Sequence, residues 1–192
     1  KSRQMLHRMK RNNEKAIVIA VGCYVNAAKE ELEKDDKIDI VVGNNKKVNI
    51  LHIIEEYISK HKVEDNYSDI NEEKAYETFH ITNIESHTRA YVKIQDGCNQ
   101  FCSYCIIPYV RGRVRSRLCE DIISEIKQLV ENGIKEVVFT GIHISSYGID
   151  FKEDMNLLKL ICKVAKIPGL ERIRLGSLEP RIITEEFVST IS

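Results

Sequence analysis

The sequence lacks a long apolar run and a secretory leader, and each absence excludes a class of protein. No stretch approaches the roughly 20 apolar residues that a membrane-spanning helix needs. The chain begins with basic residues, among them Lys1, Arg3 and Arg8, but has no apolar core of the kind that signal peptides carry. We therefore expect a cytoplasmic protein with no membrane partner.

The sequence also lacks a net charge, because 29 Lys and Arg balance 29 Asp and Glu. No overall field therefore attracts the chain to nucleic acid. The charges are unevenly spread, however: basic residues gather in the first fifteen positions and from Arg111 to Arg117, and acidic residues dominate from Glu55 to Glu85. Local basic patches can still bind phosphate. With 43% hydrophobic and 30% charged residues, the composition is typical of a globular protein.

Cysteine is present in a pattern that argues against disulfides. Three of the six cysteines fall within eight residues. In a reducing compartment such clustered thiols are more often metal ligands than disulfide partners. We therefore examine them as a metal site below.

The first part of the chain alternates strand and helix patterns, which is typical of a parallel sheet. The expected elements are a basic helix over 2–11, a strand over 16–21, a helix over 26–34 with Asn26 as its N-cap, a strand over 38–42 and a helix over 46–59. Residues 61–86 are polar and acidic with little periodicity, so we interpret them as a linker. The expected domains are therefore 1–60 and 87–192.

The second part contains three strand and helix units in series, the repeat of a parallel α/β barrel. The expected strands cover 89–94, 135–139 and 172–175, and the expected helices cover 119–132, 156–166 and a stretch that begins near Arg181. Loops that follow barrel strands carry the chemistry in such folds. Here those loops contain the clustered cysteines, then Gly141 and His143, then Ser177 and Glu179.

The first of these loops presents three thiols as Cys98-x-x-x-Cys102-x-x-Cys105. This spacing lets three thiolates ligate three corners of one [4Fe-4S] cluster and leaves one iron open to a substrate. The alternative is a structural zinc site completed by Cys119 or Cys23. Zinc modules prefer paired Cys-x-x-Cys units, so the spacing favours the cluster.

The segment from Gly97 to Arg117 resembles the radical SAM methylthiotransferases. The cysteines are followed by Ile-Ile-Pro-Tyr-Val-Arg-Gly-Arg-Val-Arg-Ser-Arg, and the resemblance extends over nearly the whole chain. It implies an α/β fold: the C-terminal part of the family's N-terminal methylthiotransferase domain, followed by the first half of a radical SAM (β/α)6 partial barrel. The family has about six such β/α units and this chain supplies three, so the third strand is expected to be an exposed edge.

The resemblance also implies cofactors and a cosubstrate site. In the family the open iron binds S-adenosylmethionine, and an electron donor reduces the cluster so that a 5′-deoxyadenosyl radical forms. Tyr104 then lies near the adenine, with simple packing as the alternative. Gly141 permits a close approach of the cosubstrate, and Ser177 and Glu179 reach its ribose or amine. Glu179 has the alternative role of capping the helix after Pro180, and for His143 we favour a capped histidine in the loop.

Only the resemblance indicates that Cys23 is a metal ligand. The segments 17–26 and 39–45 match the family's surroundings of the third cysteine of a second cluster, which delivers the sulfur. The first two cysteines of that set are absent, so one thiolate cannot hold the second cluster here. We therefore expect a fragment that begins just after the second cysteine and lacks activity alone.

Four arginines follow the cysteine loop, at Arg111, Arg113, Arg115 and Arg117. A charge run of this kind is usually a solvated face. Beside a site for an RNA substrate, however, these arginines suit contacts with phosphates. The two remaining cysteines, Cys119 and Cys162, fall on expected helices among apolar neighbours, and we interpret both as buried, unligated thiols.

The resemblance implies methylthiolation at carbon 2 of a modified adenosine beside the anticodon of tRNA. Three family substrates compete: threonylcarbamoyladenosine, isopentenyladenosine and an aspartate of a ribosomal protein. The tail Ile-Ile-Pro-Tyr-Val-Arg-Gly resembles the first group most, because the isopentenyl group usually shows Val-Val-Pro-Tyr-Thr-Arg-Gly. The rival from another class is a metal-stabilised nucleic-acid-binding module without catalysis.

Overall fold

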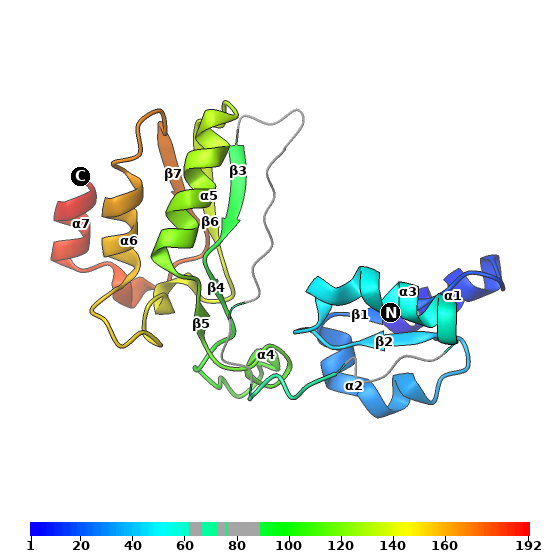
Figure 1. The fold of residues 1–192 in the computed structure, drawn as a ribbon. Coiled ribbons are helices and arrows are strands. Elements are labelled where there is room, and N and C mark those ends of the chain that lie inside the picture. The colour runs from blue at the N-terminus through cyan, green and yellow to red at the C-terminus, as the bar shows by residue number, and fades with distance from the viewer. Residues whose placement is uncertain (62–66, 73–75, 77–88) are drawn as a thin grey trace. The chain divides into compact units, whose positions relative to one another are not determined.

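The computed structural model describes residues 1–61, 67–72, 76 and 89–192 (Figure 1). The chain divides into two compact units, one of residues 1–77 with 100–112 and the other of residues 78–99 with 113–192. Most of the expected acidic linker over 61–86, and the expected boundary near residue 87, lie outside the described residues. The assignment of 100–112 to the first unit is a feature that the sequence patterns do not indicate.

The first unit is built around two short parallel strands, β1 (Ile19–Val21) and β2 (Ile40–Val42). The alternation of helix and strand is as expected, although both strands are shorter than their apolar runs. The helices of this unit are α1 (Ser2–Asn12), α2 (Cys23–Glu33), α3 (Ile50–Lys60), which follows the 3₁₀ turn η1 (Lys47–Asn49), and the short α4 (Ile107–Val110).

The expected N-cap of the second helix is wrong. Helix α2 begins at Cys23, three residues earlier than expected, and Asn26 lies inside it. Gly22 has a φ of 103°, which a residue with a β-carbon rarely adopts. This conformation turns the chain directly from β1 into the helix. The side-chain oxygen of Asn26 instead accepts a hydrogen bond of 3.1 Å from the backbone N–H of Asn44.

Two carboxylates, the buried Asp35 and the half-buried Asp39, attach helix α1 to the rest of the first unit. Asp35 accepts hydrogen bonds from Arg3 (2.9 Å) and contacts His7 (2.7 Å), and its side chain is only 3% exposed. The hydrogen bond with His7 is the main reason why the pKa of Asp35 lies below its ordinary value. Asp39 accepts a bond of 2.8 Å from Lys10. Helix α1 has no fully buried residue, so these polar contacts and the packing of Leu6 against the apolar cluster around Leu32 hold it in place.

The second unit has a parallel sheet in the order β3-β6-β7, formed by β3 (Arg89–Lys93), β6 (Glu136–Thr140) and β7 (Arg172–Leu175). The three expected β/α units are confirmed. Their helices are α5 (Cys119–Glu131), α6 (Leu157–Val164) and α7 (Glu185–Ile191), with short 3₁₀ turns η2 (Ile144–Ser146) and η3 (Pro180–Ile182). Among the described strands β7 has β6 as its sole partner, so it lies at an edge.

Two expectations about the second unit need correction. The last helix begins at Glu185, where the Thr184 side chain caps it, and Arg181 lies in the preceding 3₁₀ turn instead. The loop after β3 also contains a two-residue antiparallel pair that periodicity cannot reveal, β4 (Gln95–Asp96) with β5 (Arg115–Ser116). This pair brings the two ends of the cysteine loop together.

The core of the second unit lies between the sheet and helices α5 and α6, which contact each other. Residues such as Phe139, Ile126 and Leu160 are fully buried there. Cys119 is buried as expected, and burial raises the pKa of its thiol. The expectation for Cys162 is wrong, because this thiol is half-exposed on α6.

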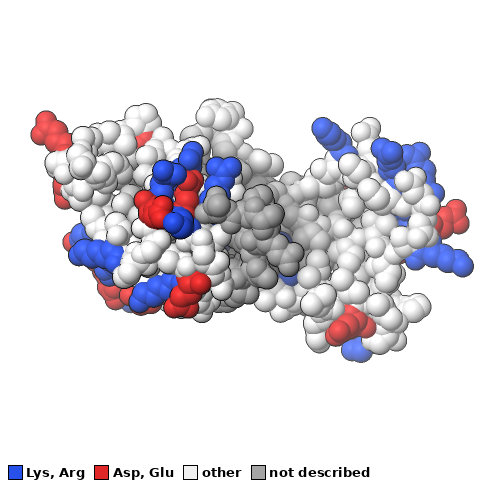
Figure 2. All heavy atoms as spheres, turned by 90° about the horizontal axis from the view of Figure 1, so that it is seen from above, with Lys and Arg blue, Asp and Glu red and all other residues white. Residues whose placement is uncertain are grey.

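The surface drawn in Figure 2 carries small groups of basic and acidic side chains separated by uncharged atoms. It shows no single field of one sign, which agrees with the balanced composition. Among the described residues, no helix has both the length and the apolar character that crossing a membrane would require.

Candidate functional site

The carboxyl ends of the three parallel strands align at one edge of the sheet in the second unit. Lys93 pairs with Thr140, and Phe139 pairs with Leu175. The segments that follow, beginning at Gln95, Gly141 and Gly176, therefore start at the same level. Parallel α/β folds place their ligands at this edge.

Gln95 connects two of these loops from a fully buried position. Its side-chain amide donates hydrogen bonds of 2.7 Å to the carbonyl oxygens of Asp96 and Gly97. Its side-chain oxygen accepts a bond of 2.8 Å from the backbone N–H of His143. One side chain thus fixes both the backbone that leads into the cysteine loop and the loop after β6. Sequence analysis missed this role, although a glutamine after a buried strand is an available signal.

The side chains of His143 and Glu179 contact each other across the loops after β6 and β7. The imidazole Nε2 lies 3.2 Å from a carboxylate oxygen of Glu179, and the other ring nitrogen contacts Ser146. Glu179 also pairs with Arg181 at 3.2 Å. The side chain of Glu179 makes no capping hydrogen bond to η3. The structure therefore shows a half-buried carboxylate in contact with His143 and Arg181 at the strand ends. His143 directly precedes η2.

Gly141 is required by packing within the protein. A β-carbon at this position would lie 2.9 Å from the carbonyl oxygen of Gln95 and 2.9 Å from a methyl carbon of Ile144. Such distances are too short for any larger residue without movement of the Gln95 backbone. The cosubstrate contact expected at Gly141 stays a prediction.

The cysteine loop passes from the second unit to the first. Cys98 is buried and belongs to the second unit, whereas the exposed Cys102 and the half-exposed Cys105 belong to the first. All three are free thiols, so the donor set fits a cluster with three protein ligands in kind. Among the residues that the structure describes, no three Cys, His, Asp or Glu side chains are already gathered to hold a metal ion.

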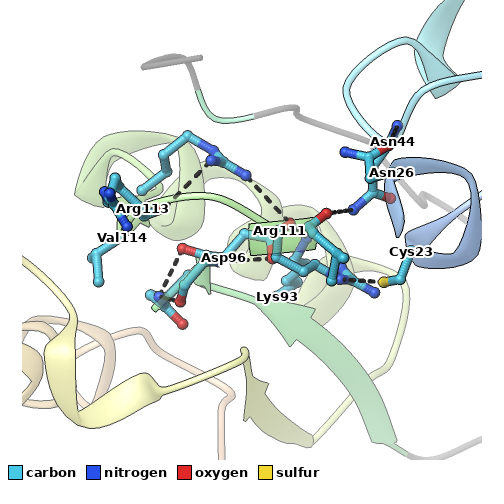
Figure 3. A network of polar contacts seen from close by, with 12 residues as sticks. Cys23, Asn26, Asn44, Lys93, Asp96, Arg111, Arg113 and Val114 are labelled. Carbon is cyan, nitrogen blue, oxygen red and sulfur yellow. Dashed lines mark hydrogen bonds and ion pairs between the residues drawn. The ribbon is translucent and has the colours of Figure 1, made fainter. Parts of the chain in front are cut away.

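Cys23 contacts an arginine of the segment that follows the cysteines. The Arg111 guanidinium donates a hydrogen bond of 3.0 Å from Nε to the Cys23 sulfur, within the first unit (Figure 3). In the same unit the Asn44 amide lies 3.5 Å from the carbonyl oxygen of Val110. Helix α4 and the start of α2 are therefore joined by polar contacts around this thiol. The sequence predicted Arg111 as an RNA contact and gave no sign of this partner.

The four arginines have different environments. Arg113 is exposed and Arg111 is half-buried. Arg115 and Arg117 are 6% and 3% exposed, and Arg117 forms an ion pair with the buried Glu125. The expectation that all four contact RNA phosphates is thus corrected for these two, because their guanidinium groups are directed into the protein.

Of the remaining expected site residues, Tyr104 is 91% exposed and Ser177 is exposed. A further pair was missed: the rings of Phe101 and Tyr109 lie edge to face, with centroids 5.5 Å apart. Phe101 lies between Cys98 and Cys102, and Tyr109 follows Cys105 by four residues. The aromatic residues in and just after the cysteine loop are therefore the sequence signal that could have indicated this pair.

The model of the Radical SAM superfamily matches residues 92–189, which include the cysteine loop and all three strand ends. The chain belongs to the radical SAM superfamily. The radical SAM family membership predicted from the cysteine loop is thereby confirmed. In this superfamily a [4Fe-4S] cluster and S-adenosylmethionine are the expected cofactors.

Curated relatives of this radical SAM chain are methylthiotransferases. It is 40% identical over 190 residues to the threonylcarbamoyladenosine tRNA methylthiotransferase MtaB of Aquifex aeolicus. The aligned region covers 99% of this chain and 46% of the relative. The MtaB of Bacillus subtilis is 38% identical over the whole chain and 42% of the relative. A tRNA-2-methylthio-N(6)-dimethylallyladenosine synthase of Clostridium novyi is 36% identical over 97% of this chain and 42% of the relative. The chain thus spans less than half the length of these relatives.

Proposed function

We propose that this chain carries the cluster-binding and cosubstrate-binding part of a tRNA methylthiotransferase. The reaction would add a methylthio group to carbon 2 of N6-threonylcarbamoyladenosine beside the anticodon of tRNA. The observation that carries the proposal is a loop of three free thiols in a chain 40% identical, over 99% of its length, to a relative of that name. A tRNA substrate would place the protein in the cytoplasm, with a reducing electron donor as a further partner.

In this proposal Cys98, Cys102 and Cys105 hold a [4Fe-4S] cluster. The cluster with bound S-adenosylmethionine supplies the radical chemistry that an unactivated aromatic C–H bond requires. Gln95 keeps the entry to the cysteine loop and the loop after β6 in register through the hydrogen bonds described above. The carboxylate of Glu179 binds the ammonium group of the cosubstrate, which replaces its contacts with His143 and Arg181.

The remaining expected residues have supporting roles in the proposal. Tyr104, exposed on the same loop, lies near the adenine, and Ser177 reaches the ribose. Arg113 contacts phosphates of the RNA, because it is the exposed member of the arginine series. Cys23 is a ligand of a second, sulfur-donating cluster, which needs two further cysteines that this sequence does not contain.

Anaerobic reconstitution with iron and sulfide tests the cluster. We expect a brown protein with about four iron and four sulfide per chain, and loss of the cluster in Cys98→Ala, Cys102→Ala and Cys105→Ala. Cys162→Ala is the matched control, because Cys162 is a half-exposed thiol on α6 outside the loop. A colourless protein that binds zinc through the same three cysteines would contradict the proposal and support the non-catalytic module.

A second candidate substrate is isopentenyladenosine, because the dimethylallyladenosine synthase of Clostridium novyi is 36% identical over 97% of this chain. Binding to anticodon stem-loop RNAs with either modified base separates the two candidates. We expect tighter binding of the threonylcarbamoyl form by the reconstituted protein, measured by fluorescence anisotropy. Tighter binding of the isopentenyl form would move the assignment to the second candidate.

A further inference from the structure

Two aromatic side chains beside the cysteine loop are exposed together in the first unit. Phe101 is 40% exposed and Tyr109 is 63% exposed. Their rings stand at 84° to each other with centroids 5.5 Å apart. Rings at this angle form the two walls of a corner, so that a flat ligand can stack on one ring and meet the edge or face of the other. An exposed pair of this kind is costly to leave facing water.

The backbone at Phe101 supports a role beyond packing. Its φ is 48°, in the left-handed region that a residue with a bulky side chain rarely adopts. Among the described residues His61 is the one other non-glycine with a positive φ, and it occupies the C-cap of α3, where this conformation is common. Phe101 ends no helix. Strained residues of this type cluster at functional sites, where the strain presents a side chain.

The charges around this pair point to a polyanion with flat groups. Within residues 100–112, the part of this segment that belongs to the first unit, the chain has Arg111 and no acidic residue. Exposed aromatic rings near a cationic side chain are a combination with which proteins bind unpaired nucleic-acid bases, because every base has a face that stacks on a ring.

We propose that Phe101 and Tyr109 form a stacking corner that receives a base of the substrate RNA beside the cysteine loop. This inference rests on the proposed function for the identity of the RNA, and it assigns the base contact to residues that the family motif did not single out. Phe101 directly precedes Cys102. A base in the corner is therefore held next to the loop that carries the thiols.

The test uses an anticodon stem-loop RNA with 2-aminopurine at the position 3′ of the anticodon. Stacking on an aromatic ring quenches this fluorophore. The wild-type chain is expected to quench it, and Phe101→Gly and Tyr109→Leu are expected to abolish the quenching and weaken RNA binding about tenfold. Phe101→Gly is the cleanest variant, because glycine adopts the observed φ without strain. Tyr109→Phe keeps the ring and should quench like the wild type.

Tyr91→Leu is the matched control. Tyr91 is 62% exposed, almost as much as Tyr109, but lies on β3 in the second unit. It should bind and quench like the wild type. The proposal is overturned if Phe101→Gly and Tyr109→Leu both behave like this control. It is also overturned if Tyr109→Phe is as impaired as Tyr109→Leu, since the hydroxyl group would then make the contact.

Cosubstrate binding separates the stacking corner from a site for adenine. If Phe101→Gly weakens S-adenosylmethionine binding to the reconstituted protein and leaves RNA binding unchanged, the rings serve the cosubstrate and the proposal fails. The cluster test is independent of RNA. If the protein binds the cluster but its RNA binding is unchanged by the ring substitutions, only the stacking corner is contradicted. If quenching depends on the rings but the protein binds no cluster, only the proposed function is contradicted.

Discussion

The two units differ in what holds them together. The second unit has one continuous apolar core between a three-stranded sheet and its helices. The first unit has a two-stranded sheet and two small clusters, one around Leu32 and the other around Ile53. It compensates with carboxylates: Asp35 and Asp39 accept hydrogen bonds from helix α1. The second unit also buries polar side chains, among them Gln95, Arg117 and Glu125, but its helices pack on the sheet through one apolar core.

The second unit contains a buried ion pair between Arg117 and Glu125, and breaking it should have the largest effect. Glu125→Leu leaves the guanidinium of Arg117 buried without its charged partner. We expect a loss of about 3–5 kcal/mol in the free energy of unfolding, measured by urea denaturation. The double variant Arg117→Met, Glu125→Leu should recover much of this loss. A loss under about 1 kcal/mol in the single variant would show that water reaches Arg117.

A substitution that creates a cavity in the core of the second unit tests whether the two units unfold independently. Leu160 is fully buried on α6, and Leu160→Ala should cost about 2–4 kcal/mol. Hydrogen exchange with mass spectrometry should show faster exchange in α5, α6 and β6. Exchange in α2 and α3 of the first unit should stay unchanged, because their apolar contacts lie in other clusters. An equal increase in both units would mean that they unfold as one.

Acid should affect the first unit through Asp35. Its pKa in the folded protein is below the ordinary 3.8, so its ionised form contributes stability at higher pH that is lost as the pH falls below about 4. Asp35→Asn should cost about 1 kcal/mol at neutral pH. The same substitution should also make amide hydrogen exchange in α1 and α2 less dependent on pH between pH 5 and pH 3. A pH dependence equal to that of the wild type would assign the acid sensitivity to other carboxylates.

The smallest effect is expected for an ion pair on the surface. Lys135 lies 2.6 Å from Glu171, and both side chains are more than 60% exposed. Lys135→Ala should leave the melting temperature unchanged within error, because water screens such pairs. A clear decrease in the melting temperature would show that a short distance alone makes an ion pair stabilising in this protein. Burial would then not be what distinguishes the pair of Arg117 and Glu125.

The sequence predicted the elements whose periodicity is strong. The three β/α units and the burial of Cys119 were predictable because long amphipathic helices and apolar strands have clear patterns. The cysteine loop was predictable from spacing and resemblance. The N-cap at Asn26 was wrong because Gly22, with a positive φ, turns the chain into the helix three residues earlier than expected.

Other features depend on contacts between distant residues, which one sequence does not display. Nothing in a run of arginines distinguishes the exposed Arg113 from Arg117, whose partner Glu125 lies one helix later. The contact of Arg111 with Cys23 joins residues 88 positions apart. Gln95 resembles any polar residue at a strand end until its bonds to Gly97 and His143 are seen.

The return of residues 100–112 to the first unit bears on the order of events during synthesis. The ribosome makes β1, α2 and β2 first, but α4 and Arg111, which contact α2 and Cys23, are made only after strand β3 of the second unit. The contacts of α4 and Arg111 with α2 and Cys23 can therefore form only after residue 112 has left the exit tunnel. Completion of one unit and the start of the other then overlap in time.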